Sequence, residues 1–248
     1  MVSICGLMPV AALDPAIAAG CSLPPQGEGR VAAVIDARSF RLEDGREFRL
    51  AGIEPADQAK GAAALAAMVT GRQVSLHGED DTPDRYGRQS ALAFLTGADN
   101  PVQSELLRQG AALVSTDVAQ RDCAAILTAA EAEARQAKRG AWADPTAIKN
   151  AESSGDILSG IGRFGVVEGK VLSVRQAGAT TYLNFGRNWT RDFAATISRR
   201  IMPTIEAAGL SPKSLENRRI RIRGVIEGRG GPRIEVLRVG QIEVLGGN

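Results

Sequence analysis

Asp84-Arg85-Tyr86-Gly87-Arg88 is a turn signal that lies between two strand-like runs, residues 73–76 and 90–95. Gly87 permits a backbone angle that other residues avoid, and Asp84 favours a turn by bonding nearby backbone amides. An arginine at the far end of such a turn can direct its planar guanidinium at the oxygens of a phosphate. The same residues also fit an exposed turn with solvated charges, so the rest of the chain decides between the two interpretations.

The segments around this turn predict a sheet followed by helices. Residues 30–42, which a break at Asp36-Ala37 divides into two strands, and residues 46–53 have strand-like patterns and are joined by Asp44-Gly45, a strong hairpin signal. Helical patterns, ended by glycine or begun by proline, follow at residues 59–69, 101–110 and 122–139. Five strands with helices on one side predict a small α+β barrel.

Several segments resemble the staphylococcal nuclease (thermonuclease-like) family in their order and spacing. They are the turn at 84–88, the upstream run 40–54, and the downstream segments 106–114, 130–135 and 140–142. The resemblance covers residues 29–145, about half of the chain. It implies an OB-type five-stranded barrel with three helices, and the hydrolysis of phosphodiesters with the help of a divalent metal ion.

The resemblance also implies roles for particular residues. Arg49 and Arg88 match the two arginines that balance charge on the phosphorus oxygens. Asp57 stands at the position of the general base. Glu54 stands at a position that binds the metal, where calcium accepts flexible oxygen geometry.

Three positions depart from the pattern of the family. The motif that usually reads Asp-Gly-Asp-Thr is Asp36-Ala37-Arg38-Ser39 here, so Arg38 stands where a metal-binding carboxylate is expected. A positive charge in that place repels a divalent cation. The second motif reads Glu54-Pro55-Ala56-Asp57, which shortens the base by one methylene and changes the turn that holds it. A base displaced by an ångström loses a large factor in rate.

Three functions are compatible with this sequence. The first is a nucleic-acid-binding protein on a nuclease-like scaffold whose metal chemistry is lost or weakened, with no cofactor expected. The second is an active calcium-dependent nuclease of DNA or RNA, with Glu54 and Asp57 sharing the metal and Arg38 turned outward. The third is an envelope protein that uses both halves for protein contacts. The departures at Arg38 and Asp57 favour the first function.

The second half of the chain differs from the first in charge. Residues 1–154 carry 15 Lys/Arg against 20 Asp/Glu, a net charge of −5, and residues 155–248 carry 15 against 8, a net charge of +7. A charged content of 23% and a hydrophobic content of 44% are typical of a globular chain and exclude a disordered one. We expect an arm at 1–28, a nuclease-like domain at 29–145, a polar linker at 146–160 and a basic domain at 161–248. Hairpin signals around one helical pattern predict a second small OB-like β-barrel in the basic domain.

A basic surface in this second half is the predicted contact for a polyanion. The strand 219–223 places Arg219, Arg221 and Arg223 on one face and two isoleucines on the other. A solvated outer face is the alternative for these arginines. Arg187 and Arg191 flank Trp189, which we expect to be exposed and able to stack a base of single-stranded nucleic acid. We expect Phe185 and Phe193 in the core.

The N-terminal residues favour export. Residues 1–20 are apolar, end in small residues and resemble a secretory signal without its positive start, which predicts a periplasmic or secreted protein. The likeness to a lipoprotein cleavage site before Cys21 is weak. Cys21 and Cys123 are either a disulfide or two unrelated buried thiols. No other apolar run is long enough to span a membrane, and no Cys/His cluster has the spacing of a zinc site.

Overall fold

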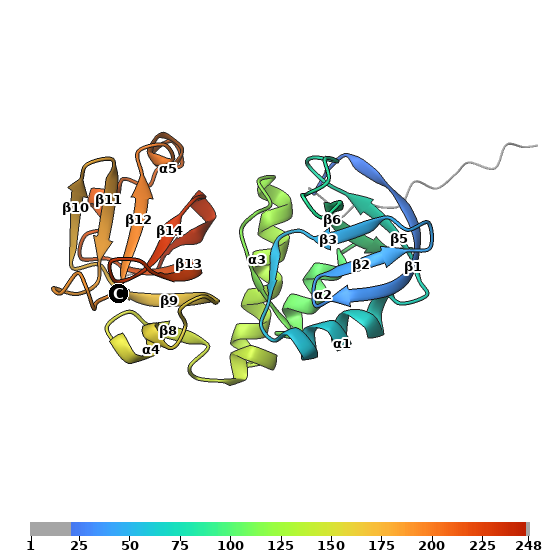
Figure 1. Cartoon of the computed structure of the whole chain (residues 1–248), viewed down its shortest axis with the longest axis horizontal. Helices are drawn as coiled ribbons and strands as arrows, with labels where there is room; N and C mark the ends of the chain where they lie inside the picture. Colours follow the sequence, from blue (N-terminus) through green and yellow to red (C-terminus); the bar gives the residue numbers. More distant parts are fainter. Residues whose placement is uncertain (1–20, 247–248) are drawn as a thin grey trace, which may run out of the picture.

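The computed structural model describes residues 21–246, which form two sheets with helices beside and between them (Figure 1). The predicted leader at 1–20 lies outside the described residues. The first sheet is a closed ring of β1 (Pro25–Asp36), β2 (Ser39–Leu42), β3 (Glu47–Leu50), β6 (Arg88–Leu95) and β5 (Gln73–His77). Neighbouring strands are antiparallel except β3 and β6, which are parallel.

The hairpin of β2 and β3 places large side chains inside the ring. Phe40 and Phe48 are fully buried and pair across the two strands, with ring centroids 6.2 Å apart. Gly45 in the turn has φ +89°, a backbone angle that favours glycine, so the predicted hairpin is present. Arg49 lies between the buried residues Phe48 and Leu50, and the alternation of a strand directs it away from the interior of the ring.

Three helices and two short strands pack beside the ring. The helices α1 (Gln58–Val69), α2 (Val102–Arg108) and α3 (Arg121–Gln136) agree closely with the predicted ones. The strand β4 (Ile53–Pro55) pairs with β7 (Ala112–Val114), and the 3-10 helix η1 (Gly140–Ala143) follows α3. The stripe that α3 buries consists of Cys123, Leu127, Ala130, Glu131 and Ala134. One carboxylate, Glu131, therefore lies on an otherwise apolar face.

The second sheet contains eight strands in the order β10-β11-β12-β14-β13-β9-β8, and β15 pairs with β13. Their bounds are β8 (Ile148–Asn150), β9 (Phe164–Lys170), β10 (Ser173–Ala177), β11 (Thr180–Asn184), β12 (Ala194–Ser198), β13 (Arg219–Gly228), β14 (Pro232–Val236) and β15 (Ile242–Val244). The short helical segments are α4 (Ser154–Leu158), α5 (Met202–Ala207), η2 (Pro212–Leu215) and η3 (Val239–Gln241).

The strands of this second sheet follow one another in the same spatial order as those of the first ring. β9 and β10 are consecutive and are interrupted only at Val171 and Leu172, whose amides donate to Arg218 and Asn184 respectively. The path from β10 through β11, β12, β14 and β13 thus returns to β9, and β12 pairs in parallel with β14 as β3 does with β6. Two further strands of this sheet, β8 and β15, have three residues each and are too short to show alternation.

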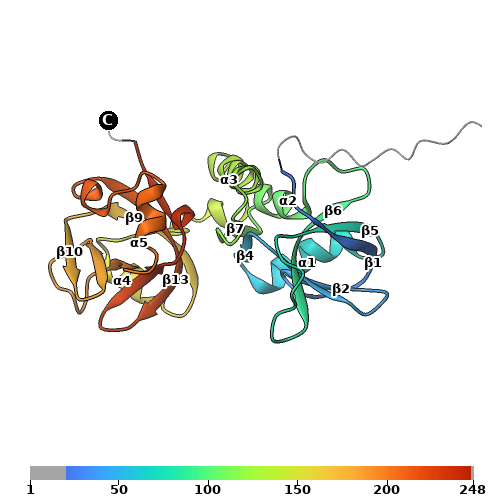
Figure 2. The same ribbon diagram turned by 90° about the horizontal axis from the view of Figure 1, so that it is seen from above.

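The segment 146–160, predicted to be a linker, folds as part of the second sheet. β8 pairs in parallel with β9, and α4 follows it. Leu113 and Trp142 of the first half share a buried cluster with Val166 of the second. Both views show α3 between the two sheets (Figures 1 and 2). The two halves therefore meet in a packed interface. The polar composition of residues 146–160 did not prevent the short strand β8 from pairing with β9 in the second sheet.

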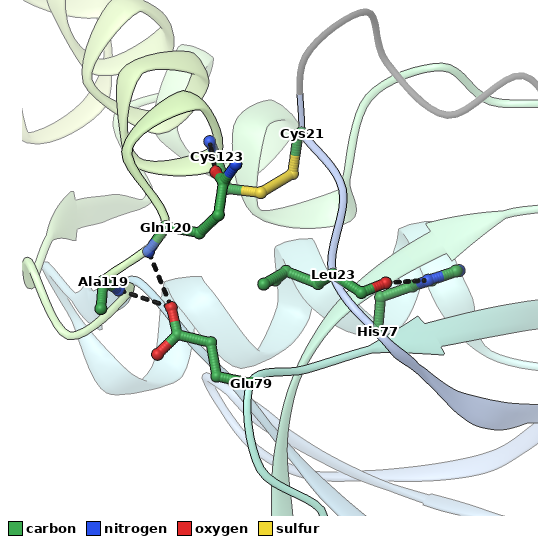
Figure 3. The surroundings of a disulfide bond; sticks show 7 residues. All are labelled: Cys21, Leu23, His77, Glu79, Ala119, Gln120 and Cys123. Atoms are coloured by element: carbon green, nitrogen blue, oxygen red, sulfur yellow. Dashed lines mark hydrogen bonds between the residues drawn. A yellow bond between two sulfur atoms is a disulfide. The ribbon is translucent and has the colours of Figure 1, made fainter.

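Cys21 and Cys123 form a disulfide that ties the N-terminal arm to the start of α3 (Figure 3). Of the two alternatives drawn from the sequence, the disulfide is the one present. The arm also contacts the end of β5, where the carbonyl oxygen of Leu23 lies 3.2 Å from His77 Nδ1. His77 thus has a structural contact at the edge of the ring.

The loop after β5 is tied to the same end of α3. Glu79 accepts hydrogen bonds from the backbone amides of Ala119 and Gln120, at 2.6 and 2.9 Å (Figure 3). The arm, this loop and the beginning of α3 are thus joined at one place.

Of the helices between residues 21 and 246, none is long and apolar enough to cross a membrane.

Candidate functional site

The turn after β1 directs the Arg38 side chain toward β4. Its Nη1 donates to Glu54 Oε1 and, at 3.3 Å, to the carbonyl oxygen of Ile53. The Arg38 amide donates to Asp36 Oδ1 at 2.9 Å, which fixes the turn. The two side chains of the ion pair are 20% and 25% exposed. Arg38 therefore points into the site, beside the one carboxylate that the sequence assigned to a metal, and not outward.

Arg49 reaches the same carboxylate from β3. Its Nη2 lies 3.7 Å from Glu54 Oε1, and its guanidinium makes no hydrogen bond within residues 21–246. Burial lowers the pKa of Arg49, and the positive charges of Arg38 and, to a smaller extent, Arg88 lower it further. Glu54 and Asp117 act in the opposite direction. The guanidinium groups of Arg38 and Arg49 thus face the one carboxylate of Glu54. Arg38 is hydrogen-bonded to it, whereas Arg49 makes only the longer ion pair.

Arg88 begins β6 and pairs with Asp84 across the turn. Its Nε and Nη2 contact Asp84 Oδ2 at 3.1 and 2.8 Å, and Asp84 Oδ1 accepts from the amides of Tyr86 and Arg88. Gly87 has φ +81°, as the turn requires. The hydrogen bonds from Arg88 lower the pKa of Asp84 to about 2, and the same pairing raises the pKa of Arg88. The turn therefore holds its own arginine in place.

Tyr86 is an exposed aromatic ring beside this arginine. Its side chain is 63% exposed, and the guanidinium carbons of Arg85 and Arg88 lie 4.7 and 4.9 Å from the ring centroid. Such cation–π contacts hold the ring near the positive charges. The sequence analysis assigned Tyr86 no role, although its position between two arginines of a turn is a usable signal.

Acidification tests the pairing of Asp84 with Arg88. Since the folded pKa of Asp84 is about 2 against an ordinary 3.8, the pairing contributes fully above about pH 4 and is lost as the pH falls through 2. We expect the carboxyl carbon of Asp84 to titrate with a midpoint near pH 2 in an NMR experiment. In Arg88→Gln the midpoint should rise toward 3.8. An unperturbed midpoint in the parent protein would contradict the pairing.

Asp57 has a structural role at the start of α1. It is the N-cap residue, and its Oδ1 accepts from the Lys60 amide at 2.8 Å. Asp57 and Lys60 line a cleft of about 800 Å³ whose lining also includes Lys149 and Arg163 of the second half. Arg38, Arg49 and Arg88 do not line this cleft. The residue predicted to be the general base thus caps α1 and lines this cleft, and its role as a base stays a prediction.

The residues around Glu54 do not fit a calcium site. Calcium takes about six to eight oxygen ligands, among them several carboxylates. Glu54 is bonded to Arg38, and no group of three or more His, Cys, Asp or Glu side chains that could hold a metal occurs between residues 21 and 246. The donor set therefore disagrees with the metal that the resemblance implies.

The arginines of β13 alternate as predicted, but two of them are buried. Arg223 is 4% exposed, and its Nη1 contacts Glu131 Oε2 on α3 at 2.9 Å and the carbonyl oxygen of Val114 at 3.2 Å. Glu131 Oε1 also accepts from the Val114 amide at 2.8 Å. This ion pair joins the first half to the second. Glu131 lies on an otherwise apolar stripe of α3, and this position in the sequence was a signal that could have predicted the ion pair.

The other two arginines of β13 pair within the second half. Arg221 is 8% exposed and contacts Glu243 at 2.7 Å and Glu168 at 3.0 Å. Arg219 is exposed and contacts Glu168 at 2.9 Å. The predicted contact of these arginines with a polyanion stays a prediction, but Arg219 alone among them has the exposure that it needs.

Trp189 is exposed as predicted, with 75% of its side chain accessible, while Phe185 and Phe193 lie in the second core at 2% and 1%. Arg187 and Arg191 are also exposed. These three predicted residues thus lie on one exposed loop, whereas Arg221 and Arg223 of β13 are buried.

The five-stranded ring, its helices and its arginine-bearing turn make up the first half of the chain. Residues 53–144 match the sequence model of the family described as Staphylococcal nuclease homologue. This confirms the resemblance, so the first half of the chain contains a staphylococcal nuclease-like domain. The match includes Glu54, Asp57 and Arg88 and begins after Arg38 and Arg49. A comparison with curated proteins finds no match.

Proposed function

We propose that this protein binds nucleic acid on a nuclease-like scaffold whose metal-dependent phosphodiesterase activity is lost or severely weakened. The ion pair of Arg38 with Glu54 carries the proposal. The guanidinium neutralises the carboxylate that a metal would need, and a divalent ion would have to approach a fixed positive charge. Asp57 Oδ1 accepts a hydrogen bond from the Lys60 amide at the start of α1, and this bond competes with a role as general base.

Arg49 and Arg88 supply the attraction for a phosphodiester. The Arg49 side chain is 32% exposed, and its N–H groups have no hydrogen-bond acceptor in the described part of the chain. Asp84 uses Nε and Nη2 of Arg88 and leaves Nη1 available. Guanidinium groups bind phosphate oxygens through paired N–H donors. The exposed ring of Tyr86 offers a surface on which a base can stack.

The arrangement of the strands and the disulfide give further support. We infer that both sheets are OB-type barrels, because they share one strand order with a parallel pair of third and last strands. We also propose that the protein works in the periplasm or outside the cell, because a disulfide such as Cys21–Cys123 persists in an oxidising environment.

Reversing the charge of Arg38 tests the loss of metal chemistry. We expect weak or no calcium binding by the parent protein in isothermal titration, and readily detected calcium binding by Arg38→Asp, since two units of charge change beside Glu54. Arg38→Asp combined with Asp57→Glu should also cleave single-stranded DNA faster than the parent.

Arg72→Asp is the matched control, because Arg72 is an exposed arginine that follows the C-terminal end of α1, whereas Glu54 precedes the start of that helix. It should leave calcium binding unchanged. Micromolar calcium binding by the parent that disappears in Glu54→Gln, together with cleavage, would establish an active nuclease instead.

A further inference from the structure

Two loops of the second sheet meet around Trp189. The β11–β12 loop carries Arg187, Trp189 and Arg191. Gly231 of the β13–β14 loop packs against it so closely that a Cβ there would lie 2.4 Å from the Trp189 carbonyl oxygen. Arg229 precedes Gly231 by two positions, and its amide donates to the Gly231 carbonyl at 3.0 Å. Arg187, Trp189, Arg191 and Arg229 are called the loop cluster below.

The arginines of the loop cluster have no carboxylate partner in the described part of the chain. All three arginines are exposed, and no ion pair or side-chain hydrogen bond to their guanidinium groups occurs between residues 21 and 246. Asp192 is the carboxylate of the same loop, and its Oδ2 accepts from the Asn188 amide at 2.8 Å. That carboxylate is therefore engaged with the backbone. The cluster differs in this respect from Arg219, Arg221 and Arg223, which all have carboxylate partners.

Hydrogen bonds within the loop hold Trp189 in place. The Asn188 carbonyl accepts from the amides of Arg191 and Asp192 at 3.1 and 2.8 Å. Asn188 Oδ1 accepts from the amide and hydroxyl of Thr190 at 3.2 and 2.7 Å. A large aromatic ring is thus exposed on a loop that is already ordered, which reduces the entropy that binding would otherwise remove.

We propose that the loop cluster is a second binding site for nucleic acid, which stacks an unpaired base on Trp189 and holds the neighbouring phosphates with its arginines. This inference rests on the proposed function and deepens it, because it names single strands as the preferred ligand. Bases in a duplex have their faces covered by their neighbours, whereas an unpaired base can stack on an exposed ring.

Charge and composition favour this occupant over a lipid surface. Binding at an interface requires a broad apolar face. Trp189 is the one large apolar residue between Gly186 and Asp192, and the other residues of that stretch are polar or charged. The ring of Trp189 and the arginines around it therefore match the alternating bases and phosphates of a nucleic-acid strand better than they match a lipid surface.

Tryptophan fluorescence of the full chain provides the test. The chain has two tryptophans, and Trp142 is only 6% exposed. We expect oligothymidylate of about ten nucleotides, a length within the range that OB-type folds bind, to quench the emission of Trp189. Trp189→Phe should lose the quenching, and Trp189→Ala should weaken binding by roughly 5- to 100-fold with an unchanged salt dependence.

The arginines are tested by the salt dependence. Arg187→Ala with Arg191→Ala should reduce the slope of log affinity against log salt by roughly 0.7 per lost phosphate contact. The matched control is Arg199→Ala with Arg200→Ala, which removes the same charge from exposed residues beyond the far end of β12. The control should retain both the quenching and most of the slope.

The outcomes separate this inference from the proposed function. Weaker binding in Arg49→Gln with unchanged binding in Trp189→Ala would overturn the inference about the loop cluster. It would still support the proposed binding of nucleic acid at Arg49 and Arg88, which is called the first site below. Quenching by oligothymidylate with unchanged binding in Arg49→Gln would support the loop cluster and count against the first site. Equal affinity for a duplex, or quenching only by vesicles of phosphatidylcholine and phosphatidylglycerol, would overturn the inference.

Discussion

Replacing both Cys21 and Cys123 by serine should lower the free energy of unfolding by about 4 to 5 kcal/mol, the value that the chain-entropy model gives for a cross-linked loop of roughly 100 residues. The two cysteines are 102 positions apart and are 2% and 1% exposed, so the bond closes nearly the whole first half. Without it, the unfolded chain gains freedom, while the folded arm keeps its noncovalent contacts, such as that of Leu23 with His77. Urea denaturation of the parent and the double variant measures the difference.

A reducing agent supplies the control for this prediction. The parent protein in excess reductant should unfold like the double serine variant, and the variant itself should not respond to reductant. A change below about 1 kcal/mol in either comparison would mean that the disulfide does not restrain the unfolded chain as its loop length predicts.

Glu131→Gln should destabilise the protein by about 3 to 5 kcal/mol, because it removes the carboxylate that hydrogen-bonds the buried guanidinium of Arg223 and leaves Glu243, 3.9 Å away, as the remaining charged partner among the described residues. Glu131 is fully buried and Arg223 is 4% exposed, so water cannot replace the lost interaction. The pair also joins α3 to β13, and its loss should therefore loosen the interface between the halves. Chemical denaturation followed by circular dichroism measures the effect.

The same helix offers a matched control. Glu133 contacts Arg108 at 3.2 Å, but its side chain is 55% exposed, so Glu133→Gln should cost no more than about 1 kcal/mol. Replacing both buried partners, with Glu131→Leu and Arg223→Met, should recover much of the stability lost in Glu131→Gln. Similar effects of Glu131→Gln and Glu133→Gln would show that the interface pair is hydrated in solution.

Local patterns were sufficient to predict the first ring and its helices. The hairpin at Asp44-Gly45 and the three helices follow from turn residues, alternation and helix ends, all of which act over a few positions. The disulfide was left open, because a spacing of 102 residues shows nothing about distance in space. The direction of the Arg38 side chain could not be predicted from the sequence either, because it depends on how the turn after β1 packs against β4.

In the second half, local patterns predicted the strands but not which of their side chains are covered by other elements. Alternation correctly separated Ile220 and Ile222 from the arginines of β13, but it cannot tell whether solvent or another element covers the polar face. Here α3 covers Arg223, and Glu168 and Glu243 engage Arg221. The exposure of Trp189 was predicted correctly, because polar neighbours on both sides in the sequence are a local property.

The burial of Arg223 also determines how this protein can be divided for assay. A fragment of residues 161–248 would lack α3, so it would present to solvent a cation that the intact chain covers. A fragment of the first half would present the carboxylate of Glu131 in the same way. Each fragment would carry an artificial charged surface, and the two would attract each other when mixed at low salt. Polyanion affinities measured on separated halves would therefore describe those exposed cut surfaces and not the protein itself.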